Sequence, residues 1–169
     1  MMLLRYLLFL LLATSALTRK RQYSCRKTAP CGCSEGATVT KIVGGEPVKG
    51  RPWGWMVSLT RYSNHTHFCG GSILSESWIL TAAHCFVNYN PSGIIIHAGS
   101  NHLRHSTQKR QIARIFPHPD FDWDTYVNDI ALVQLLTPFD MEDHNISKIC
   151  LPSNMSKTSL MKYFSSDFT

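Results

Sequence analysis

The sequence predicts an all-β domain, a barrel or a sandwich, within residues 42–152. Two observations carry this prediction. Short runs rich in Val, Ile, Trp and Phe are separated by segments of Gly, Pro, Asn and Ser, which is typical of strands joined by turns. No long stretch repeats its apolar residues with the period of a helix. Several short strands at this spacing favour a closed or two-layered β architecture.

Each expected strand is an apolar run that ends at a segment containing Gly, Pro, Asn or Ser. The expected strands are 53–59, 68–74, 78–82, 94–98, 111–116 and 130–136. We find no internal repeat, and the length of this region suits one hydrophobic core.

The first residues are typical of a secretory signal, which we place at residues 1–16. Arg5 precedes an apolar run over residues 6–13, and the small residues Ser15 and Ala16 follow. The run is shorter than the roughly 20 apolar residues that span a bilayer. We therefore expect a secreted, extracellular protein with no membrane association once the signal is removed. Residues 17–41 are polar, basic and cysteine-rich, and we expect a propeptide there.

Cysteines and glycosylation motifs agree with secretion. The chain has six cysteines, which in a secreted chain favour disulfides over metal ligation. The spacing of Cys31 and Cys33 is too tight for an ordinary zinc pair. Sequons for N-glycosylation begin at Asn64, Asn145 and Asn154.

The net charge of +6 is concentrated at one end of the chain. Arg19, Lys20, Arg21, Arg26 and Lys27 crowd the expected propeptide, and the rest is nearly balanced. Aromatic residues do not interleave with these cations as they do in proteins that bind single-stranded nucleic acid. We expect no nucleic-acid partner. A solvated basic surface is the favoured interpretation, and binding of a heparin-like polyanion is the alternative.

Two motifs carry residues suited to acid–base catalysis. Thr81-Ala82-Ala83-His84-Cys85 places a histidine at the end of one apolar run, and Asn128-Asp129-Ile130-Ala131-Leu132 places an aspartate at the head of another. A catalytic histidine needs a carboxylate to fix its tautomer and to stabilise the imidazolium that forms when it accepts a proton. It also needs a nucleophile to deprotonate.

These motifs occur in order with several others, and together they resemble the trypsin-like (chymotrypsin-fold) serine protease family. The shared motifs are Ile42-Val43-Gly44-Gly45, Pro52-Trp53, Cys69-Gly70-Gly71, the segment 78–85, His118-Pro119, the segment 128–132 and Ile149-Cys150-Leu151-Pro152. The family fold has two six-stranded antiparallel β-barrels with the active site between them. The resemblance runs from residue 42 to about residue 152 and covers the first barrel. It implies that residues 153–169 begin the segment between the barrels.

The resemblance assigns catalytic roles to His84 as general base and to Asp129 as the residue that orients it. It also implies a Cys69–Cys85 disulfide that braces the histidine. The 169 residues contain no Gly-Asp-Ser-Gly-Gly-type motif, so no nucleophile is assigned. Ser72, beside Cys69-Gly70-Gly71, is interpreted as a structural strand residue. We expect a truncated peptidase domain that is inactive by itself, and a non-catalytic binding or decoy homologue is the alternative.

The resemblance further implies a zymogen. The bond between Lys41 and Ile42 matches the activation cleavage site, which calls for an activating protease of trypsin-like preference. Cys150 matches the cysteine that tethers the propeptide to the barrel. Its partner would be Cys25, Cys31 or Cys33; one of the last two is favoured, and Cys33 is the residue we assign.

No cofactor or metal is expected. The sequence has neither Asp nor Glu between Glu76 and Asp120, where related enzymes sometimes bind calcium through acidic side chains. Two histidine pairs, His65 with His67 and His102 with His105, lack supporting carboxylates or cysteines and are interpreted as exposed loop residues. The expected partners are protein or peptide substrates and the activating protease.

Overall fold

The computed structural model describes residues 30–32, 53–86, 90–103 and 105–152. The expected signal peptide, most of the expected propeptide with Lys41 and Ile42, and residues 153–169 with Asn154 lie outside the described residues. Within the described part, no helix is both long and apolar enough to cross a membrane.

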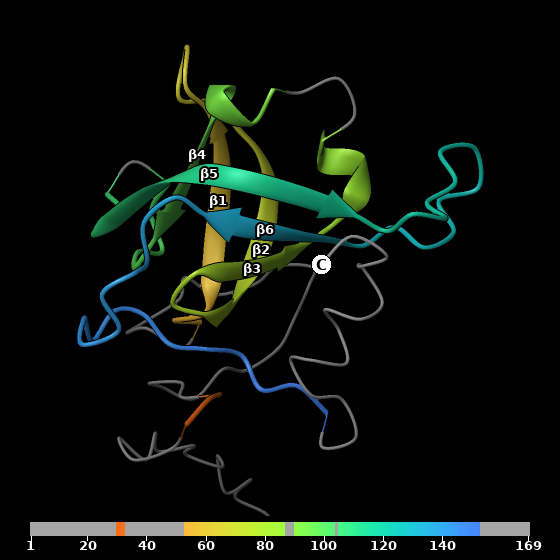
Figure 1. Ribbon diagram of the computed structural model, residues 1–169. Coiled ribbons are helices and arrows are strands. Elements are labelled where there is room, and N and C mark those ends of the chain that lie inside the picture. Colours follow the sequence, from red (N-terminus) through yellow and green to blue (C-terminus); the bar gives the residue numbers. More distant parts are fainter. Residues whose placement is uncertain (1–29, 33–52, 87–89, 104, 153–169) are drawn as a thin grey trace, which may run out of the picture.

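Six antiparallel strands form a closed barrel in the order β1-β2-β3-β6-β5-β4 (Figure 1). The strands are β1 (Met56–Arg61), β2 (His67–Ser75), β3 (Trp78–Thr81), β4 (Ile94–Ala98), β5 (Gln108–Pro117) and β6 (Ala131–Leu135). Two 3-10 helices, η1 (Ala83–Phe86) and η2 (Pro91–Gly93), follow β3 and precede β4. The predicted all-β class is confirmed, and the closed six-stranded antiparallel barrel agrees with the single barrel that the resemblance implies for this part of the chain.

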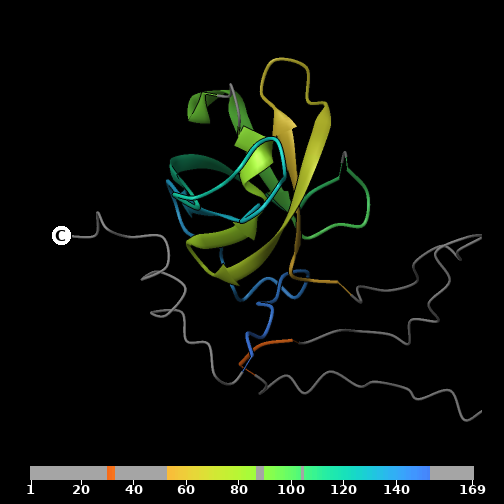
Figure 2. The same ribbon diagram turned by 90° about the vertical axis from the view of Figure 1, so that its right-hand side faces the viewer.

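The barrel closes between β1 and β4, where Val57 pairs with Ala98 and Leu59 pairs with Ile96. These four side chains are buried together in the core, whereas Ser58 of β1 is not part of that cluster. Alternate residues of a strand point to opposite faces of a sheet, so this register directs one face of each strand inward. Figure 2, a view turned by 90°, shows the strands wrapping around a common interior.

Gly71 lets β1 and β3 approach β2 closely. A Cβ atom at this position would lie 2.9 Å from Cγ2 of Ile79 and 3.0 Å from the carbonyl oxygen of Leu80. Such distances require the neighbours to move, and one of these neighbours is backbone. Gly71, the second glycine of Cys69-Gly70-Gly71, therefore allows the strands to pack closely and does not form a turn.

A disulfide joins Cys150 to Cys31, so the assignment of Cys33 as its partner is wrong. The backbone N–H of Gly32 donates a hydrogen bond to the carbonyl of Lys148 over 2.6 Å, and Gly32 has a φ of 67°. A Cβ at Gly32 would lie 2.8 Å from the Cys150 sulfur. This turn places Cys31 against Cys150 and requires a residue without a side chain at position 32, which is glycine. Cys33 lies outside the described residues.

Asp143 fastens the loop between β4 and β5 to the segment after β6. Its Oδ2 accepts hydrogen bonds from the Thr107 hydroxyl over 2.6 Å and from Nε2 of Gln108 over 3.2 Å. Its Oδ1 accepts from the backbone N–H of Asn145 over 2.9 Å. Burial by itself raises the pKa of Asp143, but these hydrogen bonds outweigh it and lower the pKa to about 2.

This depressed pKa predicts a pH-dependent stability. Hydrogen bonds in the folded state stabilise the ionised Asp143 carboxylate, and the unfolded chain lacks them. Their contribution to the free energy of unfolding is complete above the unfolded pKa of 3.8 and is lost as the pH falls toward about 2. Urea unfolding of the wild-type chain between about pH 5 and pH 2 should show a loss of stability. Asp143→Asn should make that loss smaller without abolishing it, because the pKa values of Asp122 and Asp129 are also lowered in the folded state. Asp124→Asn, on an exposed loop, is the control. An unchanged pH dependence in Asp143→Asn would contradict this account.

Candidate active site

The end of β3 and helix η1 hold His84 in place. The Thr81 hydroxyl donates to the Gly70 carbonyl over 2.7 Å, which ties the end of β3 to β2. Cys85 is buried and forms the expected disulfide with Cys69 of β2. His84 therefore follows a hydrogen-bonded strand end and precedes a covalent link, and its side chain remains 42% exposed. The local sequence fixes the backbone and leaves the imidazole accessible.

A tight turn in front of β6 positions Asp129. Asn128 has a φ of 59°, in the left-handed region that asparagine tolerates better than most residues. Its side-chain amide donates to the Asp120 carbonyl over 3.0 Å, and its own carbonyl accepts from the Ile130 N–H over 2.7 Å. The turn presents the Asp129 carboxylate toward the end of β3.

Asp129 contacts both the side chain and the backbone of His84. Its Oδ2 lies 2.7 Å from Nδ1 of His84, and its Oδ1 accepts a hydrogen bond from the His84 backbone N–H over 2.9 Å. Burial opposes ionisation of this carboxyl, but hydrogen bonds from the His84 backbone and ring and from the Ala83 backbone lower the pKa of Asp129 below its ordinary value. An ionised Asp129 accepts hydrogen bonds only, so it fixes the proton of neutral His84 on Nδ1.

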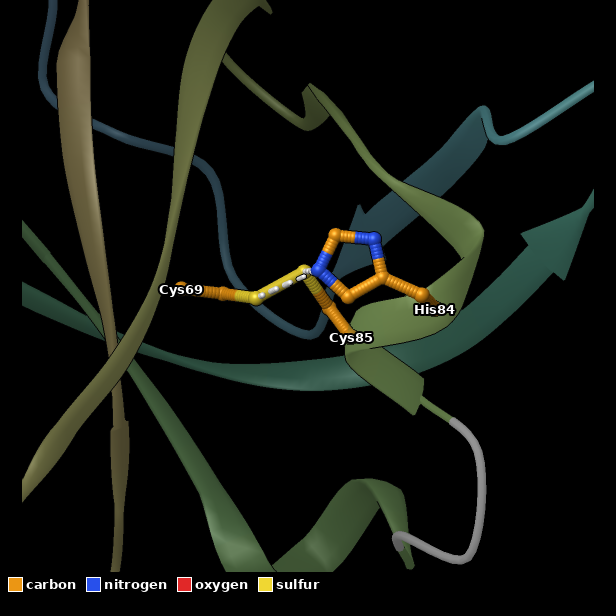
Figure 3. Close-up of side chains that lie close together, drawn as sticks. All are labelled: Cys69, His84 and Cys85. Atoms are coloured by element: carbon orange, nitrogen blue, oxygen red, sulfur yellow. Dashed lines mark hydrogen bonds between the residues drawn. A yellow bond between two sulfur atoms is a disulfide. The ribbon is translucent and has the colours of Figure 1, made fainter. Parts of the chain in front are cut away.

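With Nδ1 engaged, Nε2 of His84 carries the free lone pair. The ring lies beside the Cys69–Cys85 disulfide, with Nε2 at 3.7 Å from the Cys85 sulfur and 3.9 Å from the Cys69 sulfur (Figure 3). A neutral imidazole in this state accepts a proton at Nε2, and Asp129 stabilises the imidazolium that results. The arrangement supplies a general base and the group that orients it.

An aromatic cluster beside His84 was not foreseen from the sequence. The ring centroid of Tyr126 lies 5.9 Å from that of His84, and the Trp123 ring lies 5.5 Å from Tyr126. Both aromatic side chains are exposed. They lie in the segment between β5 and β6, which extends beyond the barrel in Figure 1. The density of aromatic residues between Phe121 and Tyr126 was the available signal.

The other residues singled out in the sequence lie away from this pair. Ser72 pairs within the sheet with Met56 and Leu80, in the middle of β2. The rings of His102 and His105 are 6.2 Å apart in an exposed loop. His67 instead contacts a hydroxyl, with its Nδ1 2.8 Å from Oγ of Ser58.

Two of the three predicted glycosylation sites fall within the described residues and differ in their surroundings. Asn64 lies on the exposed turn between β1 and β2, and its Oδ1 accepts from the Thr66 N–H over 3.1 Å. Asn145 is half-buried, and its Nδ2 donates to Oδ1 of Asp143 over 2.5 Å.

Comparison with known proteins agrees with this geometry. The family model described as Trypsin matches residues 42–162. The chain belongs to the trypsin family of serine proteases. Among curated proteins, this trypsin-family chain is similar to serine proteinase stubble of Drosophila melanogaster, with 37% identity over 126 residues. The aligned part covers 69% of this chain and 16% of the fly protein.

Proposed function

We propose that the barrel with His84 and Asp129 is the half of a secreted serine-type endopeptidase that carries the general base, and that this enzyme hydrolyses peptide bonds through an acyl-enzyme. The observation that carries the proposal is the double contact of Asp129 with His84, at 2.7 Å to Nδ1 and 2.9 Å to the backbone nitrogen. A carboxylate engages Nδ1 while the His84 side chain stays 42% exposed, and a general base in this chemistry needs both conditions.

In the proposed mechanism, Nε2 of His84 removes the proton of a serine hydroxyl as that oxygen attacks the substrate carbonyl. Asp129 stabilises the resulting imidazolium, which then gives its proton to the leaving amine. The serine and the groups that bind the oxyanion belong to a second barrel, which the 169 residues do not contain. We therefore expect the 169-residue chain alone to be inactive.

The proposal includes synthesis as a zymogen. The basic residue Lys41 ahead of Ile42 supports activation by a protease that cleaves after basic residues. The Cys31–Cys150 disulfide supports retention of the propeptide after that cleavage, because it joins the segment before Lys41 to the segment after β6. The leader-like residues 1–16 and the disulfides support secretion.

A labelling experiment tests this function. Two proteins are purified: the 169-residue chain, and the product of the same reading frame followed as far as its stop codon. Both are cleaved between Lys41 and Ile42 and treated with a fluorophosphonate that reacts with activated serines. The extended product should be labelled and should hydrolyse peptides, and the 169-residue chain should do neither. Labelling of the short chain would contradict the proposed division of the site. An extended product with no reactive serine would favour the non-catalytic binding module instead.

A further inference from the structure

Three potential metal ligands converge at the base. Nε2 of His84 and the sulfurs of Cys69 and Cys85 all lie within 4.8 Å of one another, and Figure 3 shows the imidazole edge directed at the disulfide. In the oxidised chain the sulfurs of Cys69 and Cys85 are bonded to each other, so they are not available as thiolates. Breaking this one bond changes the chemistry of the cluster.

We propose that reduction of the Cys69–Cys85 disulfide creates a zinc site formed by the two thiolates and Nε2 of His84. A phosphine or a dithiol supplies the two electrons and is itself oxidised, and each sulfur then takes up a proton. Zinc displaces these two protons when it binds the thiolates. Sulfur and imidazole ligands in this ratio suit zinc, which prefers tetrahedral coordination.

Two edges of the ligand triangle already have the required lengths. Zinc bonds of about 2.3 Å to sulfur and about 2.1 Å to nitrogen, at a tetrahedral angle, separate N and S by roughly 3.6 Å. The Nε2–sulfur distances are 3.7 Å for Cys85 and 3.9 Å for Cys69. Only the two sulfurs must move apart, and reduction releases them from each other.

The group that supports the metal-binding histidine is also in place. A histidine that binds zinc usually donates its other ring N–H to a carboxylate, which fixes the tautomer and makes the ligand more basic. Asp129 occupies this position, 2.7 Å from Nδ1. With the His84 side chain 42% exposed, a water molecule can take the fourth coordination position.

The barrel holds the two cysteines near each other without their disulfide. Cys69 lies in β2, which pairs with β3 through Ser72 and Leu80. The Thr81–Gly70 hydrogen bond joins the two strands beside the cysteines. The ligands therefore remain close together after reduction, which lowers the entropic cost of assembling the site.

Zinc at this site would occupy Nε2, the atom that accepts the proton in the proposed mechanism. Reduced, zinc-loaded protein would then have no free base at His84. Metal binding itself needs only these three side chains and the fold, so it does not depend on the proposed peptidase activity.

The test uses the 169-residue chain with its other cysteines replaced by serine, so that Cys69 and Cys85 are the only thiols. The replaced residues are Cys25, Cys31, Cys33 and Cys150. After phosphine reduction, Co²⁺ serves as a spectroscopic probe, and Zn²⁺ displaces it in a competition titration. We expect a thiolate–cobalt absorption band and one metal per reduced chain, and no such band in the oxidised chain.

Variants separate this site from incidental binding. His84→Ala should abolish the one-to-one complex, and Asp129→Asn should weaken zinc binding by about 10- to 100-fold. His105→Ala, which alters the exposed histidine pair, should leave the affinity unchanged. Circular dichroism of the reduced chain follows the fold. Binding that is unaffected by His84→Ala, binding lost in His105→Ala, or a reduced chain that unfolds and is not refolded by zinc would each overturn the proposal.

Discussion

Replacing Asp129 with Asn is expected to lower kcat of the activated two-barrel enzyme by about 10⁴-fold, as the same change does in the Ser-His-Asp template. The asparagine amide can donate a hydrogen bond to Nδ1, which would move the imidazole proton to Nε2. Nε2 would then have no lone pair for the serine proton. The shape of the site would be kept, because the asparagine oxygen can still accept from the backbone N–H of His84.

Steady-state kinetics on a peptide substrate measure this effect. Asp124→Asn, in the same exposed segment, is the matched control and should retain activity. A loss smaller than about tenfold in Asp129→Asn would mean that the carboxylate does not set the tautomer of the base.

Leu59→Ala is expected to lower the free energy of unfolding by about 2–5 kcal/mol. Leu59 is fully buried at the closure between β1 and β4, where it pairs with Ile96 and shares the core cluster with Val57. Removing its isobutyl group loses transfer free energy and leaves a cavity that the closed sheet cannot fill easily.

Leu136→Ala makes the same chemical change at a side chain that is 61% exposed, and it should alter stability by less than about 0.5 kcal/mol. Urea unfolding of the oxidised chain provides both values. Equal effects of the two substitutions would show that the barrel core is not centred on Leu59.

The strands could be predicted from the sequence because each is a short apolar run between turn residues. Expected strand 94–98 coincides with β4, whereas β5 extends three residues beyond the start of expected strand 111–116, to Gln108. The three added residues include Lys109, which is exposed, so the apolar pattern could not mark the beginning of β5. Barrel closure was beyond local patterning, because it pairs β1 with β4 across a large sequence separation. The resemblance to a known family, not the periodicity, distinguished a barrel from a sandwich.

At the site, the two motifs identified His84 and Asp129 but not how they meet. The hydrogen bond that the His84 backbone N–H donates to Oδ1 of Asp129 depends on the left-handed turn at Asn128, which no spacing rule predicts. The wrong partner for Cys150 has a similar cause. Two cysteines separated by a single glycine are equivalent in sequence, and the pairing of Cys31 with Cys150 goes with a left-handed backbone at Gly32 that the sequence pattern does not show.

The tautomer of His84 decides whether this residue can act as a base oriented by Asp129, and ¹⁵N NMR of the oxidised 169-residue chain measures it. The spectrum is recorded at a pH where the imidazole is neutral, with His144, an exposed histidine, as the internal reference. We predict a protonated Nδ1 and an unprotonated Nε2 in the wild-type chain, with the proton moved to Nε2 in Asp129→Asn. A wild-type His84 protonated on Nε2 would contradict the assignment of this residue as a base oriented by Asp129.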